Sequence, residues 1–92
     1  MTAPSAGWRA TIDVTLPDPG WCRWIEQALA PEVAREVPRA RARVERRGSH
    51  GLAIEIEARD AGGVRAALNT YLGWVQLSVA ALRAGAAPPP AE

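Results

Sequence analysis

The chain has 92 residues and a formal net charge of +1, and 48% of its residues are hydrophobic. A chain of this length forms one domain, and its hydrophobic content is too high for a disordered protein. The near-neutral charge argues against a dedicated nucleic-acid-binding domain, which is usually strongly basic.

A strand and a helix are predicted first. Residues 8–16 alternate between apolar and polar side chains, which is typical of a strand with one buried face. Asp18 followed by Pro19 is typical of a helix start. We expect this helix to run to about Ala30, where Pro31 stops or kinks it.

A hairpin is predicted after Pro38. Alternating residues predict a second strand before the turn at residues 48–51 and a third strand over residues 52–58. A turn centred on Ser49 sets a register in which two oppositely charged pairs meet on the outer face, Arg43 with Glu55 and Arg41 with Glu57.

The last predicted element is a long helix from Asp60, its expected cap, to about Ala84. One apolar stripe is expected to face the core and comprises Val64, Leu68, Tyr71, Leu72, Val75, Val79 and Leu82. A second stripe of small or apolar residues without charge comprises Ala66, Thr70, Gly73, Leu77, Ala80 and Ala84. A small domain buries only one such stripe in itself, so the second stripe predicts a partner. Trp74 borders both stripes, and core packing and partner contact both stay open for it.

These elements predict an α+β fold in the order strand, helix, strand, strand, helix. A right-handed crossover followed by a hairpin gives a three-stranded antiparallel sheet with both helices on one face, ferredoxin-like but lacking the last strand. We expect the domain to span residues 8–84, between disordered tails at residues 1–7 and 85–92. The first strand is then an unpaired edge. Our hypothesis is that two copies pair there into a six-stranded sheet, through Arg9, Ala10, Thr11, Ile12, Asp13 and Val14.

Arginines around the hairpin are the candidate nucleic-acid feature, and comprise Arg39, Arg41, Arg43, Arg46 and Arg47. Neighbouring glutamates offset much of their charge and no aromatic residue alternates with them, so a solvated sheet face is the competing interpretation. Arg46 and Arg47 have no predicted partner, which makes them the candidates for phosphate contact.

Other chemistry has little support in the sequence. The lone Cys22 excludes a disulfide framework, fits a reducing cytoplasm, and is expected to be a buried small hydrophobe. His50, in a Gly-flanked turn, has no companion at ligand spacing, so we expect no metal and no cofactor. Without a base and nucleophile held together, we expect neither an enzyme nor a small-molecule substrate.

No apolar run approaches the roughly 20 residues of a membrane span, and no signal peptide is visible.

The sequence resembles a known family. The order of elements and the run VRAALNTYLGWVQL (64–77) are similar to the small subunit of the KEOPS complex, the family called Pcc in archaea and fungi and CTAG-like in animals. The runs LAPEV (29–33) and GLAIEIEARD (51–60) also match that family, and the similarity covers about residues 10–82.

The resemblance implies a non-catalytic subunit. It implies a homodimer that binds the KEOPS catalytic subunit through its helices and helps the assembly hold tRNA, whose adenosine beside the anticodon receives a threonylcarbamoyl group. The expected helix interface comprises Ala66, Thr70, Gly73, Trp74, Leu77, Ala81, Trp21 and Trp24, with core packing as the competing interpretation for Trp21 and Trp24. The alternative function is a stand-alone homodimeric RNA-binding or scaffold module of the same fold.

Overall fold

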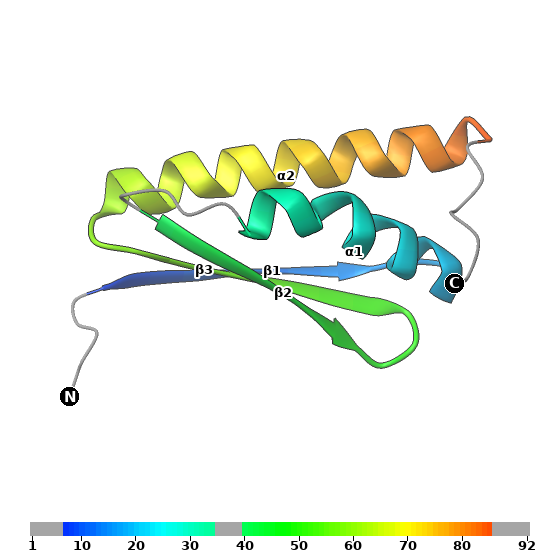
Figure 1. Ribbon diagram of the computed structural model, residues 1–92, viewed down its shortest axis with the longest axis horizontal. Coiled ribbons are helices and arrows are strands. Elements are labelled where there is room, and N and C mark those ends of the chain that lie inside the picture. Colours follow the sequence, from blue (N-terminus) through cyan, green and yellow to red (C-terminus); the bar gives the residue numbers. More distant parts are fainter. Residues whose placement is uncertain (1–6, 35–39, 86–92) are drawn as a thin grey trace.

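A computed structural model describes residues 7–34 and 40–85 of the chain. Figure 1 shows its elements, which are β1 (Trp8–Thr15), α1 (Pro19–Ala34), β2 (Ala40–Arg47), β3 (Gly51–Ala58) and α2 (Ala61–Arg83). This is the predicted α+β order of strand, helix, strand, strand, helix. Arg39 and most of the two predicted tails lie outside the described residues.

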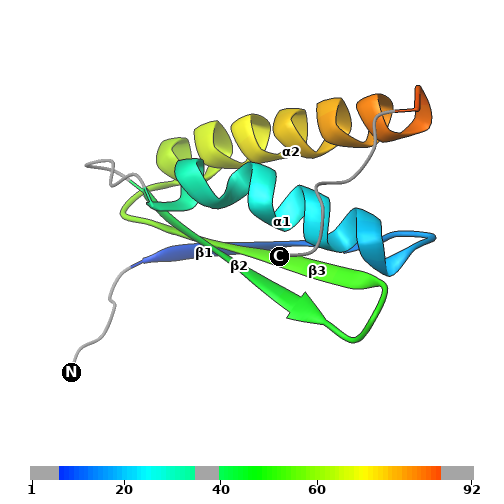
Figure 2. The same cartoon turned by 45° about the vertical axis from the view of Figure 1, so that its right-hand side comes forward.

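The three strands form one antiparallel sheet in the order β1-β3-β2. Both helices cover the same face of the sheet, α1 mainly over β2 and α2 mainly over β3 and β1 (Figures 1 and 2). The predicted hairpin register is confirmed, because Arg43 lies opposite Glu55 and Arg41 opposite Glu57. Since β3 is central, β1 and β2 are the two edges of the described sheet.

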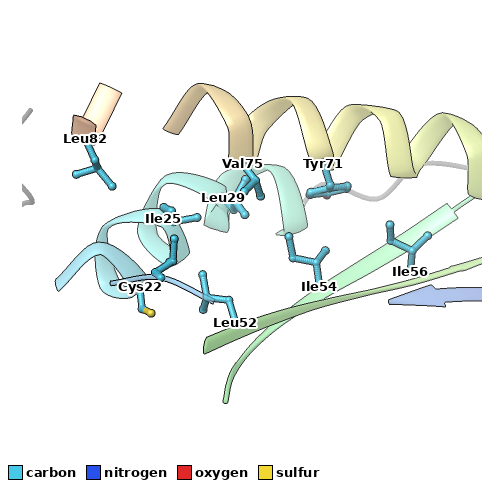
Figure 3. Close-up of a cluster of buried hydrophobic side chains, with 10 residues drawn as sticks. Cys22, Ile25, Leu29, Leu52, Ile54, Ile56, Tyr71, Val75 and Leu82 are labelled. Atoms are coloured by element: carbon cyan, nitrogen blue, oxygen red, sulfur yellow. The ribbon is translucent and has the colours of Figure 1, made fainter. Parts of the chain in front are cut away.

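The core fills the layer between the helices and the sheet (Figure 3). It comprises Leu16, Cys22, Ile25, Leu29, Leu52, Ile54, Ile56, Tyr71, Val75 and Leu82. Even-numbered residues of β3 point toward the helices, as the alternation predicts. Cys22 is fully buried, which confirms the expectation for this residue.

Both helices begin at aspartate caps. The Asp18 carboxylate accepts a hydrogen bond from the Gly20 N–H, and the Asp60 carboxylate accepts one from the Gly63 N–H, each at 2.7 Å. These bonds satisfy N–H groups that the first helical turn leaves without a partner. The described helices are therefore fixed where the sequence predicted their starts.

The predicted end of the first helix is wrong, because α1 continues through Pro31 to Ala34. A proline inside a helix removes one hydrogen bond, the one to the carbonyl four residues earlier. That carbonyl belongs to Gln27, which is exposed, as is Pro31 itself. Water can therefore hydrate the freed carbonyl, and the helix tolerates the loss.

The predicted core stripe of α2 is wrong at Leu72, which is 40% exposed. The buried side of the helix is centred on Tyr71, Val75 and Leu82, and it includes Ser78. Leu72 lies about 100° around the helix from Tyr71, beyond the arc that the sheet and α1 cover.

Candidate interaction surfaces

β1 presents a free strand edge eight residues long. The N–H of Leu16 donates a hydrogen bond to the His50 carbonyl at 2.8 Å. Backbone groups alternate in direction along an antiparallel strand, so the even-numbered residues of β1 turn their N–H and C=O toward β3. The odd-numbered residues turn theirs to the open side of β1, and these are Arg9, Thr11, Asp13 and Thr15. In the described sheet no strand lies on that side.

The side chains of β1 leave this edge accessible. Trp8, on the helix-facing side of the strand, is 54% exposed. Arg9 forms an ion pair with Glu57 at 3.1 Å, yet its side chain remains 71% exposed. Asp13 is exposed, and no basic side chain of the described residues lies within ion-pair distance of it. No proline interrupts the strand and no row of like charges protects it.

β2 is the opposite edge and is rich in arginine, which occupies four of its eight positions. Arg46 lies opposite Leu52, on the face that the helices cover, and pairs with Glu26 of α1 at 3.5 Å. Charges that point to the covered face are one way in which natural sheets prevent pairing at an edge. β2 therefore has the character of a protected edge.

The expectation that Arg46 and Arg47 have no partner is wrong. Arg46 pairs with Glu26, and Arg47 pairs with Glu55 at 3.2 Å and with Glu45 at 3.5 Å. The sequence missed the first pair because it joins a strand to a helix that only the tertiary fold brings above it.

Ion pairs also neutralise much of the outer sheet face. Arg43 donates a hydrogen bond to Glu55 at 2.8 Å, and this bond raises the pKa of Arg43 above its ordinary value. Glu57 pairs with Arg9 on β1, whereas the sequence predicted a pair with Arg41 on β2. Glutamates of the central strand thus form ion pairs with arginines of both edge strands. These pairs favour the interpretation that this surface is a solvated sheet face.

α2 carries the third surface, its side away from the core. Leu77 is 66% exposed and Trp74 is 39% exposed. The other members of the second stripe are exposed except Gly73, which is half-buried. A Cβ atom added to Gly73 would have nothing within 4 Å, so the packing of the chain itself does not require glycine there.

The remaining interface candidates are more enclosed. Trp21 and Trp24 are half-buried and pack against the core cluster, which favours the core interpretation for both. Ala81 is also half-buried. The exposed members of the predicted helix interface therefore all lie on α2.

The described residues show little that resembles a catalytic or metal site. No group of three or more His, Cys, Asp and Glu residues could hold a metal ion there. Burial raises the pKa of the Cys22 thiol, while the nearby Arg46 acts against that rise. His50 is exposed, and its Nδ1 lies 2.8 Å from the Ser49 hydroxyl. In residues 7–34 and 40–85, neither helix combines the length and the hydropathy that a membrane-spanning segment needs.

A protein-family model described as "Transcription factor Pcc1" matches residues 9–83, from the start of β1 to the end of α2. The chain belongs to the Pcc1 family. This is the KEOPS subunit family that the sequence resembles, so the resemblance is confirmed. The Pcc1 family is not a known family of catalysts. No curated protein matches the chain.

Proposed function

We propose that this Pcc1 protein is a non-catalytic scaffold subunit of a KEOPS complex. It pairs with a second copy through β1, binds the catalytic subunit through α2, and thereby supports tRNA binding for threonylcarbamoyladenosine formation beside the anticodon. The proposal places it in the cytoplasm, where a lone Cys22 stays reduced. The observation that carries the proposal is that a Pcc1-family fold leaves two separate surfaces open, the β1 edge and the outer side of α2.

The α2 surface suits contact with another helix. Leu77 and Trp74 supply exposed apolar area, and aromatic anchors often dominate the energetics of an interface. Gly73 lies one residue before Trp74 and adds no side chain, so a partner backbone can approach closely. Helices that pack with small residues at the crossing point reach the short end of the usual 8–10 Å interaxial range, that is, roughly 8 Å.

A matched pair of substitutions tests this surface. Leu77→Asp places a charge in the proposed interface, whereas Gln76→Asp places the same charge one residue earlier, among the solvated positions of α2. We expect Leu77→Asp to abolish binding to the host's KEOPS catalytic subunit and Gln76→Asp to preserve it, as measured by light scattering on a sizing column. Equal binding by both variants would contradict the proposed role of α2.

For tRNA we propose contact only through the assembled complex, with Arg41, Arg43, Arg46 and Arg47 as the candidate residues. Three of these four are already in ion pairs, so each would exchange a carboxylate for a phosphate. Arg46→Ala combined with Arg47→Ala should weaken tRNA binding by the complex at low salt and leave assembly intact. Unchanged tRNA binding across a salt series would refute the contact.

A further inference from the structure

We infer that two copies of this chain join their β1 strands about a two-fold axis that passes between the two copies of Thr11, so that each Thr11 faces the other. The inference rests on the proposed homodimer and adds its register, which decides the residues that meet across the interface. The two copies then recognise each other by charge as well as by backbone hydrogen bonds.

Symmetry restricts the possible registers. A two-fold axis perpendicular to the sheet keeps the helices of both copies on the same face of one continuous sheet. Residues that meet across the axis point to the same face of the sheet, so one residue of β1 must face its own copy, and the axis passes between those two copies. β1 spans Trp8–Thr15, and the two residues at its middle are Thr11 and Ile12. These two positions give the registers with the longest overlap.

The register about Thr11 brings opposite charges together twice. Arg9 of each copy faces Asp13 of the other on the outer side of the sheet. Both side chains are exposed, and Asp13 lacks an ion-pair partner among the described residues. Cross-strand pairs of opposite charge stabilise antiparallel sheets.

The cross-strand rows that begin at Asp13 and Arg9 extend the same charge complementarity across each sheet. Across the sheet, Asp13 is followed by Ala53 and then by Glu45, which makes an acidic row. Arg9 is followed by Glu57 and then by Arg41, a row with two arginines. In the Thr11 register each acidic row of one copy continues into an arginine-containing row of the other.

The helix-facing side gains apolar contacts in the same register. Trp8 faces Val14 of the second copy, and Ala10 faces Ile12. This position covers the indole of Trp8, which the single chain leaves 54% exposed. The backbone groups that Arg9, Thr11 and Asp13 turn to the free edge all find partners.

The register about Ile12 lacks these pairs of opposite charge. It places Arg9 opposite Thr15 and Asp13 opposite Thr11, so that no two opposite charges meet directly across the interface. The Ile12 register pairs the free-edge backbone groups of Thr15 as well, whereas the Thr11 register places Thr15 opposite residue 7, just outside β1. The backbone alone does not favour Thr11, and the choice of register rests on charge. Charge therefore selects the axis at Thr11.

Disulfide trapping tests the axis. In the Thr11 register two copies of Thr11→Cys face each other with Cα atoms about 5.5 Å apart, within disulfide range. We expect this variant to form a covalent dimer under mild oxidation, while Ile12→Cys, two residues out of alignment with its copy, does not. The native Cys22 is fully buried and can stay in place in both variants. Cross-linking of Ile12→Cys and not Thr11→Cys would overturn the register.

A charge exchange tests the recognition. Arg9→Asp or Asp13→Arg alone should weaken dimerisation by about tenfold, because each creates two like-charge pairs, and the double variant should recover most of the loss. The charge exchange distinguishes a wrong register from a wrong homodimer. A wild-type dimer with no such recovery overturns the register alone, whereas a wild-type protein that stays monomeric overturns the proposed homodimer itself.

Discussion

The two edges of the sheet have the same length and the same central neighbour, yet their charges differ. β2 carries four arginines and one glutamate, and β1 carries one arginine and one aspartate. Two copies of β2 would bring arginine against arginine in either central register, although Glu45 would face Arg41 in one and Arg43 in the other. The stronger obstacle is Arg46, whose charge points to the face that the helices cover. Two copies of β1 bring opposite charges together.

This difference shows how a small sheet can be open at one edge and closed at the other. An edge with an inward-pointing charge hinders open-ended growth, and an edge that attracts its own copy permits a dimer. Assembly through strands then stops at two chains. The predictions below test each edge, beginning with the largest expected effect.

Proline substitution at the β1 edge should have the largest effect. Thr11→Pro removes an N–H group that points to the free side of β1, and it leaves the hydrogen bonds between β1 and β3 in place. We expect this variant to be folded and monomeric, as measured by circular dichroism and light scattering.

The matched control is Ala42→Pro on β2. On β3 the odd-numbered residues bond to β2, so Ala42, an even-numbered residue of β2, turns its N–H to the free side of its own strand. Ala42→Pro should keep the wild-type mass. Loss of the dimer in Ala42→Pro with retention in Thr11→Pro would show that the wrong edge has been assigned.

Removing charge from β2 should allow copies of the chain to pair at this second edge as well. Arg41→Thr combined with Arg46→Val removes one arginine from each face of the strand and leaves an edge rich in β-forming residues. We expect assemblies larger than a dimer that grow with protein concentration. A mass that stays at the wild-type value over the same concentration range would show that these arginines do not protect the edge.

A substitution on α2 should act independently of both edges. Gly73→Ala should raise the free energy of unfolding by about 1 kcal/mol, because alanine favours a helix over glycine and its Cβ has nothing within 4 Å. The mass of the free protein should not change, but binding to the catalytic subunit should weaken because the Cβ enters the helix interface. Urea unfolding and a binding titration measure the two effects, and tighter binding by Gly73→Ala would argue against close approach at this position.

The smallest expected effect reports the position of Arg46 beneath α1. Burial raises the pKa of Cys22 above its ordinary value of 9.0, and the positive charge of Arg46 lowers it. The neutral thiol is therefore the form that the fold favours, and its contribution to stability is lost as the pH rises from the unfolded pKa through the folded pKa.

Arg46→Gln should raise the Cys22 pKa further, as followed by the ultraviolet absorbance of the thiolate. The stability that this thiol contributes should then be lost over a wider range at alkaline pH, and Cys22→Ala should remove this contribution. An unchanged Cys22 pKa in Arg46→Gln would place the guanidinium away from the thiol.

The sequence predicts well those features that depend on neighbouring residues. Alternation and a three-residue turn fixed the hairpin register, and Asp60 was sufficient to place the start of α2. The sequence does not predict features that depend on how the helices pack on the sheet. Leu72 looks like a core residue until the covered arc of α2 is known, and the partner of Arg46 lies on a helix twenty residues away in sequence.

The candidate surfaces divide in the same way. The free β1 edge follows from strand order, which the sequence predicts. Protection of β2 depends on the inward direction of Arg46 and on its ion pair with Glu26, which require the packed fold.

The mass of the purified protein in solution tests the account most directly. Light scattering over a concentration series, up to high micromolar, should give twice the chain mass of 9.8 kDa and no larger species. A monomer throughout that range would contradict pairing through β1, and continued growth beyond the dimer would contradict the closure of β2.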